Sequence, residues 1–249
     1  MNRVLLFALS FCGLAMTGSE KPVTSSSSSA KHVVGPSTKA AEPVSFVAPS
    51  ANHAAPNAFL TVYDELNLAS AGLSRDVYAL ALRGMQRISA ARPLLSIVDM
   101  SQPSSRKRLY VIDLVRRKLL FNTYVAHGRN SGELLAKRFS NTNSSYQSSL
   151  GFYKTMGLYQ GKHGLSMQLQ GLERGINDNA FNRAIVMHGA DYVCEDVIRR
   201  TGRLGRSQGC PAVSVNECPS IIRTISGGSC LFIYSPDATY LKQSAFLRS

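Results

Sequence analysis

The chain has 249 residues, 44% hydrophobic and 17% charged, which is enough for one or two globular domains. Past the N-terminal segment no apolar run reaches about 18–20 residues, which excludes a multi-span membrane protein. The formal net charge of +13 favours an anionic partner without identifying it. Five cysteines are too few for a disulfide-dense scaffold and lack the paired spacing of a zinc site.

Residues 1–19 have the pattern of an export signal peptide. Arg3 provides the positive start, an apolar run follows, and small residues come after it. The run is too short for a comfortable membrane span, although an uncleaved signal would still anchor the chain. Lipid attachment at Cys12 is an alternative that the preceding Phe11 disfavours. We therefore expect an exported protein of the periplasm or cell envelope, with no membrane span after signal cleavage.

Residues 20–57 are expected to form a disordered linker. They contain five consecutive serines and five prolines, with few large apolar side chains. Such a segment buries too little surface to offset its chain entropy. A structured but irregular arm is the alternative.

Two helices are expected to open the folded part, residues 58–249. Apolar residues within 59–68 predict a first short helix. Ser74 is a favourable N-cap for a second, whose apolar positions recur at helical spacing over 77–88. Pro93 ends it. These apolar faces are expected to pack in the core.

The pattern then changes to that of a mainly β domain. Three strands are predicted as a meander, at residues 94–100, 109–114 and 118–126. The remainder is Gly-rich and is expected to be irregular apart from short elements. These are strands at 184–188, 212–215 and 230–234, and helices at 191–201 and 217–225. The predicted fold is one mostly β domain with a short helical N-terminal lead.

Two segments contain residues suited to catalysis. An apolar strand ends at His188, and Gly189 then turns the chain; further on, small residues bracket Cys210. A cysteine nucleophile needs a base within hydrogen-bond reach, and the amides of Gly209 and Cys210 are candidate donors to an oxyanion. His188 lies 22 positions before Cys210, which fits two strand ends that meet across a loop. A buried cysteine beside a core histidine is the alternative.

The motif His188-Gly189-Ala190 followed by Ser207-Gln208-Gly209-Cys210 resembles the signature of murein L,D-transpeptidases. That family carries a histidine–glycine pair, a gap and a Ser/Thr-x-Gly-Cys nucleophile motif. The resemblance also includes segments 127–128, 148–153, 161–164 and 171–190, and covers roughly residues 94–235. Two features depart from the usual motif. Gln208 stands where a histidine is common, and Pro211-Ala212 stand where a basic or apolar residue and an asparagine are common.

The resemblance implies a β-sandwich-like catalytic domain that acts on the peptide stems of peptidoglycan. Cys210 would attack the carbonyl of the L-centred residue of a tetrapeptide stem, and the terminal D-alanine would leave. An amine of a second stem would resolve the thioester to give a 3→3 cross-link. Water as the acceptor would make the enzyme an L,D-carboxypeptidase instead. No cofactor is expected.

Roles for the remaining residues follow from this chemistry. His188 would take the thiol proton and return it to the leaving amine. Ser207 would either hydrogen-bond near the nucleophile or shape the turn, and the group that orients His188 stays open. Arg206 suits a stem carboxylate, with an unspecialised surface arginine as the alternative. The candidates for contact with substrate are Gln208, Arg206, His127, His163 and Tyr153.

The other cysteines leave two readings open. In an exported protein Cys194, Cys218 and Cys230 would form one disulfide and leave one thiol, or would be three reduced, buried thiols. A cysteine locked in a structural bridge cannot attack a carbonyl. Cys210 is therefore expected to stay free.

Three other functions are alternatives to acyl transfer. A zinc site built from histidines and Cys210 is disfavoured because no H-x-H or H-E-x-x-H spacing occurs. A non-catalytic wall-binding module would explain the charge and would not require Cys210. Nucleic-acid binding has only the charge in its favour, so no nucleic-acid partner is expected. The basic turns at residues 106–108 and 116–118 are expected to be solvated. The oligomeric state is left open.

Overall fold

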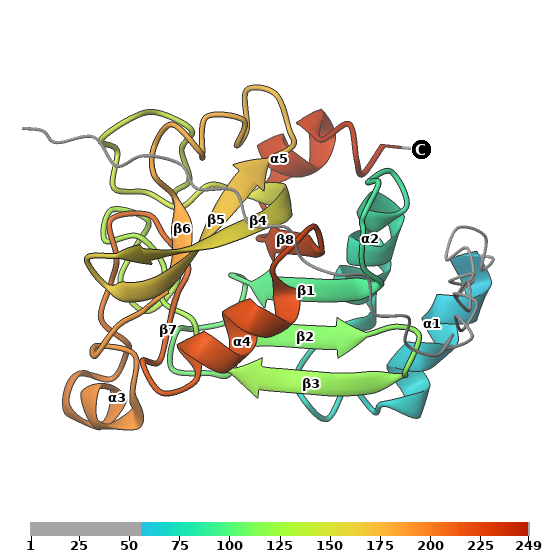
Figure 1. Cartoon of the computed structure of the whole chain (residues 1–249), viewed down its shortest axis with the longest axis horizontal. Helices are drawn as coiled ribbons and strands as arrows, with labels where there is room; N and C mark the ends of the chain where they lie inside the picture. Colours follow the sequence, from blue (N-terminus) through green and yellow to red (C-terminus); the bar gives the residue numbers. More distant parts are fainter. Residues whose placement is uncertain (1–55, 249) are drawn as a thin grey trace, which may run out of the picture. The chain divides into compact units, whose positions relative to one another are not determined.

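The computed structural model describes residues 56–248, shown in Figure 1. The expected signal peptide, and the expected linker up to residue 55, lie outside the described residues. Helix α1, Pro56–Glu65, begins two residues before the expected boundary of the folded part. Among the described residues, no helix has both the length and the apolar character that crossing a membrane requires.

The helical lead forms as the sequence predicts. Helix α2, Arg75–Met85, has Ser74 as its N-cap, and the Ser74 hydroxyl accepts a hydrogen bond from the Val77 amide at 3.2 Å. This bond satisfies one of the amides that the first helical turn leaves unpaired. Val77 and Ala81 are buried, so the apolar face of α2 packs in the core.

Eight strands form one hydrogen-bonded series, and the mainly β fold class is confirmed. The order across the sheet is β3-β2-β1-β8-β4-β5-β6-β7. The pairs β1–β8 and β6–β7 are parallel, and the other neighbours are antiparallel. The strands are β1 Leu94–Asp99, β2 Leu109–Asp113, β3 Lys118–Thr123, β4 Gly151–Gly161, β5 Gly164–Gly171, β6 Val186–Gly189, β7 Ala212–Val213 and β8 Cys230–Tyr234.

The β4–β5 hairpin corrects the expectation that this region is irregular. These are the two longest strands, with 11 and 8 residues. The inner half of β4 is buried, whereas residues 157–160 are exposed, so no apolar alternation runs through the outer half. A register shift between Thr155 and Leu158 interrupts the pattern further. Backbone hydrogen bonds between β4 and β5 hold the hairpin together beyond the core. The pattern of apolar residues in the sequence does not reveal such bonds.

Three short helices complete the fold. Helix α3, Glu195–Thr201, starts later than expected because residues 191–194 form a turn. Helix α4, Cys218–Ile225, agrees closely with its prediction and buries an isoleucine-rich face. Helix α5, Ala238–Gln243, was not predicted. It is capped by Asp237, whose carboxylate accepts from the Tyr240 amide at 2.8 Å.

A buried carboxylate ties α5 to the sheet. Glu173 accepts hydrogen bonds from the Phe152 amide at 2.8 Å and from the Tyr240 hydroxyl at 3.0 Å, and also from the Ser244 hydroxyl. Burial raises the pKa of Glu173, and these donors oppose the rise by stabilising its charged form. The Phe152 ring itself stacks on Phe232, with centroids 4.2 Å apart.

Gly84 of α2 lies against the Phe152 ring, which makes a testable prediction about packing. A Cβ at position 84 would lie 1.9 Å from Phe152 Cζ. Although alanine favours a helix by about 1 kcal/mol, overpacking dominates in a dense core. We expect Gly84→Ala to lower the free energy of unfolding by about 2 kcal/mol in urea denaturation.

The matched control is Gly157→Ala, because a Cβ there meets no heavy atom within 4 Å. Its unfolding free energy should stay within about 0.5 kcal/mol of the unaltered protein. Equal effects of the two substitutions would show that the contact between Gly84 and Phe152 does not limit packing.

Candidate active site

Strand β6 places His188 inside the sheet next to β7. Within the sheet, His188 is opposite Ser166 of β5 and Ala212 of β7. Its Nδ1 is 2.9 Å from the Gly189 carbonyl oxygen and donates to it. The carbonyl fixes the neutral tautomer, so the Nε2 lone pair is left to accept a proton. A backbone carbonyl therefore orients the ring.

Cys210 lies two residues before Ala212, at the entry to β7, so the β6–β7 pairing brings the cysteine segment to the strand that carries His188. Ser207 shapes the turn in front of it. The Ser207 hydroxyl donates to the Cys210 carbonyl at 2.6 Å and accepts from the Gly209 amide at 3.0 Å. The Gly209 amide, one of the two candidate oxyanion donors, is therefore already engaged by this acceptor.

Glycines let three backbone segments approach one another beside Cys210. A Cβ on Gly128 would lie 2.9 Å from the Gly209 Cα and 2.5 Å from the Tyr146 carbonyl oxygen. Ser148 links the same segments, since its hydroxyl accepts from the Gly128 amide and donates to the Gly209 carbonyl, both at 3.0 Å. These contacts hold residues 207–210, which we call the nucleophile loop after the role proposed for Cys210 below, and they leave no room for a side chain at position 128.

The Cys210 thiol is protonated at rest. Its Sγ donates to the Ala184 carbonyl oxygen at 3.7 Å, and Ala184 has a left-handed backbone with φ +53°. Burial raises the thiol pKa, while the Val186 amide and the charges of Arg183 and Lys162 oppose part of that rise. The thiol therefore needs a base to take its proton.

His163, from the β4–β5 turn, covers the His188 ring. The two imidazoles stack with centroids 4.6 Å apart and planes 22° apart. Burial lowers the pKa of His188, and His163 and Lys162 lower it further, against the Gly189 hydrogen bond, which raises it. His188 is therefore neutral at neutral pH and able to act as a base.

His127 lies behind the nucleophile loop. Arg108 Nη2 donates to His127 Nδ1 at 2.8 Å, and His127 Nε2 donates to the Gly132 carbonyl at 3.2 Å. Both ring nitrogens are thus engaged inside the protein. Burial and the Arg108 charge lower the pKa of His127 to about 4.

Arg108 corrects the expectation that the basic turns are solvated. Its side chain is fully buried and donates to the Val125 carbonyl through Nε at 3.1 Å and Nη2 at 2.9 Å. Burial lowers its pKa to about 9, with partial compensation from Asp99. The guanidinium joins β2 to the segment that carries His127.

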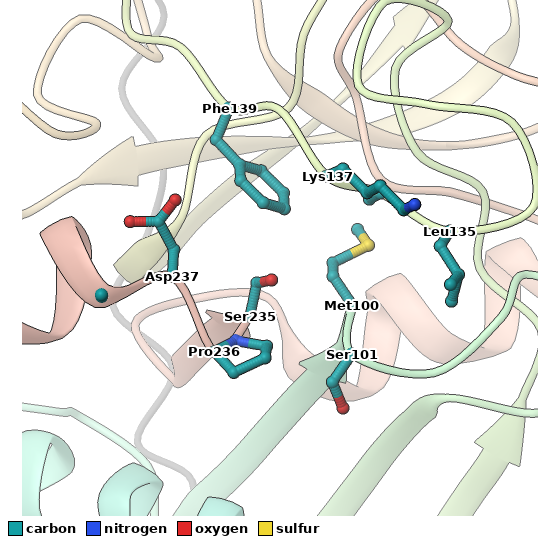
Figure 2. A pocket seen from close by; sticks show the side chains of 10 residues that line it. Met100, Ser101, Leu135, Lys137, Phe139, Ser235, Pro236 and Asp237 are labelled. Carbon is teal, nitrogen blue, oxygen red and sulfur yellow. The ribbon is translucent and has the colours of Figure 1, made fainter.

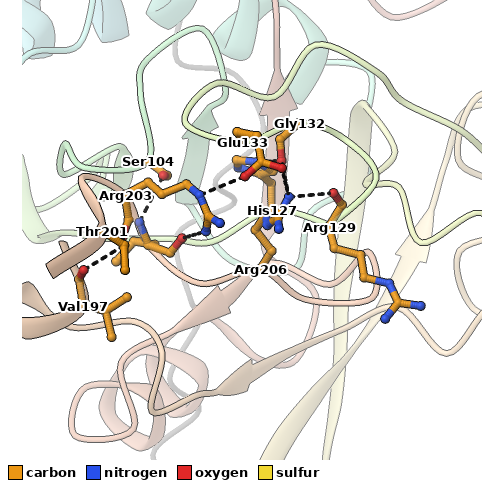
Figure 3. Close-up of polar contacts among 10 residues, drawn as sticks. Ser104, His127, Arg129, Gly132, Glu133, Val197, Thr201, Arg203 and Arg206 are labelled. Atoms are coloured by element: carbon orange, nitrogen blue, oxygen red, sulfur yellow. Dashed lines mark hydrogen bonds and ion pairs between the residues drawn. The ribbon is translucent and has the colours of Figure 1, made fainter.

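The other residues expected to contact substrate differ in their exposure to solvent and in the partners they already have. The Tyr153 side chain is fully buried, and its hydroxyl donates to the Ser149 carbonyl at 2.9 Å. Arg206 pairs with Glu133 at 2.5 Å, in a cluster that also contains Arg203 (Figure 3). Gln208 is exposed. Of these residues, Gln208 is the one that is freely presented to solvent.

Two residues near the thiol were not recognised in the sequence. Arg183 precedes β6, and its charge acts on Cys210. Tyr192 follows β6; burial and then the Cys210 charge raise its pKa to about 12. Both flank the His188 strand, but neither belongs to a pattern that distinguishes it from an ordinary loop residue.

The described cysteines are all free thiols: Cys194, Cys210, Cys218 and Cys230. Of the two readings left open, the structure therefore has reduced thiols. Cys218 and Cys230 are buried, and Cys194 is partly buried. Within residues 56–248, no three His, Cys, Asp or Glu side chains gather in a group that could hold a metal ion.

A separate cavity of about 430 Å³ lies where β1 and β8 end and α5 begins (Figure 2). Its lining includes apolar Met100 and Phe139 together with charged Lys137 and Asp237. Neither His188 nor Cys210 lines it, so it is distinct from the candidate active site.

A cysteine at the entry to β7 and a histidine on the paired strand β6, in a mainly β sheet, characterise this site. The family model for the L,D-transpeptidase catalytic domain matches residues 69–234. The chain therefore belongs to the L,D-transpeptidase catalytic domain family.

Solved structures give weaker likenesses. An L,D-transpeptidase from Mycobacterium smegmatis is 11% identical, with a TM-score of 0.36, over 57% of this chain and 59% of that one. An L,D-transpeptidase from Stackebrandtia nassauensis is 13% identical, with a TM-score of 0.34, over 72% and 77%. The chain thus spans less than two thirds of the Mycobacterium smegmatis structure. No curated protein matches the chain.

Gly209 gives a prediction about the nucleophile loop. Its φ is +125°, and a Cβ there would lie 2.8 Å from the Gln147 carbonyl oxygen and 3.0 Å from Ile185 Cδ1. We expect Gly209→Ala to cost about 3 kcal/mol of unfolding free energy, from backbone strain together with these contacts.

The control is Gly175→Ala, at φ +77° with nothing within 4 Å of a new Cβ. It should cost only the strain, about 1 kcal/mol. Urea denaturation of both variants measures the difference. If Gly209→Ala lowered the free energy of unfolding no more than Gly175→Ala, the contacts with Gln147 and Ile185 would not be what requires glycine at position 209.

Proposed function

We propose that the protein is a cysteine acyltransferase that acts on peptidoglycan stem peptides. The observation that carries the proposal is the β6–β7 pairing, which places His188 beside the entry of the Cys210 strand in a member of the L,D-transpeptidase catalytic domain family. A neutral imidazole with a free Nε2 and a protonated thiol are the reactants that general-base activation of a nucleophile needs.

The reaction proceeds in two acyl transfers. His188 Nε2 takes the Cys210 proton, and the sulfur attacks the carbonyl of the L-centred residue of a tetrapeptide stem. The L–D peptide bond breaks, His188 returns the proton to the departing D-alanine amine, and a thioester remains on Cys210. The amine of a second stem then attacks the thioester and loses a proton to His188, which gives a 3→3 cross-link and restores the thiol.

The acceptor distinguishes this function from its nearest alternative. If water resolves the thioester, the product is a tripeptide and the enzyme is an L,D-carboxypeptidase. A binding module for the wall would need neither Cys210 nor His188. The free Cys210 thiol and the buried His188 on the strand that pairs with β7 favour an enzyme over a binding module.

Other parts of the proposal concern location and contacts. Residues 1–19 act as an export signal, and the protein works in the periplasm or cell envelope. Gln208 and His163 are the candidates for contact with substrate, because both are exposed, His163 stacks on His188, and Gln208 lies two positions before Cys210. Ser207 and Gly209 form the turn that presents Cys210.

The assignment is tested by mass spectrometry of the protein with a disaccharide-tetrapeptide. We expect a dimer that has lost one D-alanine with the unaltered protein and no product with Cys210→Ala. Tripeptide alone would assign carboxypeptidase activity. Turnover by Cys210→Ala equal to that of the unaltered protein would refute the cysteine mechanism. A retained affinity for sacculi without turnover in either protein would favour the binding module.

The pH dependence of kcat/KM gives a second test. His188 must be neutral to accept the proton, and burial lowers its pKa below the ordinary value of about 6.5. The acid limb of the profile should therefore lie below pH 6.5. Lys162 lowers the pKa of both His188 and Cys210. We therefore expect Lys162→Gln to move both limbs of the profile to higher pH.

The control for this shift is Lys242→Gln on α5, which removes the same charge away from the site. Its profile should coincide with that of the unaltered protein. An acid limb that stays fixed or moves to lower pH in Lys162→Gln would contradict the proposed role of His188.

A further inference from the structure

Arg183 is a partly buried cation beside the nucleophile loop. Its Nη2 lies 3.5 Å from the position that a Cβ on Gly209 would occupy, one residue before Cys210. The same Nη2 donates to the Gln147 carbonyl at 2.7 Å, and that carbonyl oxygen also borders Gly209. The guanidinium therefore lies where the loop at residues 140–149 meets the nucleophile loop.

Four hydrogen bonds fix this guanidinium, and all four acceptors are neutral. Nη1 donates to the Ser140 carbonyl at 2.7 Å and to the Ser149 hydroxyl at 2.5 Å. Nη2 donates to the Ser145 hydroxyl at 3.1 Å in addition to Gln147. The ion pairs among residues 56–248 do not include Arg183. Its charge is thus held rigidly in place without a carboxylate to neutralise it.

We infer that Arg183 is the fixed counter-charge of the Cys210 thiolate. When the S–H bond breaks and the proton passes to His188, the electron pair stays on sulfur, and the guanidinium stabilises that negative charge. Arg183 keeps its own protons throughout. It acts through the sulfur rather than on substrate, so it is a positioning residue. The inference rests on the proposed nucleophile role of Cys210.

The other groups that face Cys210 do not replace Arg183. Lys162 is a second cation but is exposed at the β4–β5 turn, where solvent screens it more strongly. Tyr192 stays neutral because its pKa is raised to about 12. His188 becomes positive only after it has taken the proton. Arg183 and Lys162 are both charged before proton transfer, and Arg183 is the less solvated of the two, so its charge acts more strongly.

The test measures the thiol and not turnover. The rate at which iodoacetamide alkylates Cys210 is followed against pH in the full chain, with peptide mass spectrometry to separate it from the other cysteines. Arg183→Gln removes the charge, and Arg183→Lys keeps it. We expect Arg183→Gln to raise the apparent thiol pKa by about one unit, with roughly tenfold slower alkylation below that pKa. Arg183→Lys should shift it far less.

A second pair of variants leaves Arg183 unchanged. Ser145→Asp would place a carboxylate against Nη2, and Ser145→Asn is its uncharged match. Ser145→Asp should raise the thiol pKa as Arg183→Gln does, and Ser145→Asn should leave it in place. This pair decides the question if Arg183→Gln does not fold.

Two results would overturn the inference: equal shifts in Arg183→Gln and Arg183→Lys, or equal behaviour of Ser145→Asp and Ser145→Asn. Either would give Arg183 a purely structural role. Alkylation needs no peptidoglycan, so the two assays decide separate questions. A negative cross-linking assay would not change the result for Arg183, and a negative alkylation result would not change the outcome of the cross-linking assay.

Discussion

The pairing of β6 with β7 is the constraint on which the rest of the site depends. Strand β7 has only two residues and is the last strand of the sheet, so its pairing with β6 alone is a weak attachment. Its other side is held by Ala126, whose amide donates to the Ala212 carbonyl at 2.8 Å. Ala212 is thus held by β6 on one side and by Ala126 on the other. Because Cys210 lies two residues before Ala212, its position relative to His188 is fixed as well.

Burial sets the protonation states of Cys210 and His188, the proposed reacting pair. It raises the pKa of Cys210 and lowers that of His188, so both groups are neutral at rest. Separating a proton from the thiol then creates two charges in a poorly solvated place, which is costly unless charges nearby compensate. Arg183, Lys162 and the Val186 amide supply that compensation on the side of the sulfur. The site thus combines two groups that are stable when neutral with surroundings that favour the ionised sulfur.

Local patterns were sufficient for some parts of the molecule and not for others. The strands at 94–99 and 109–113 are fully buried and mostly apolar, and Ser74 caps its helix, so each could be predicted from neighbouring residues. The motif around Cys210 and His188 was readable from residue types and spacing. The outer β4–β5 hairpin was not, because it is polar and exposed. The roles of buried Arg108 and partly buried Arg183 were not, because their acceptors come from distant segments. Arg183, for example, donates a hydrogen bond to the Ser140 carbonyl, 43 positions away.

The hydrogen bond from Cys210 Sγ to the Ala184 carbonyl has a consequence for the chemical durability of the protein. Peroxide and disulfide oxidants react with the thiolate form of cysteine and only slowly with the thiol. A sulfur that rests protonated against a carbonyl is therefore protected from oxidation while the site is idle. The thiolate exists only while a base holds the proton. Ambient oxidants should therefore inactivate this protein more slowly than one whose cysteine rests as an exposed thiolate.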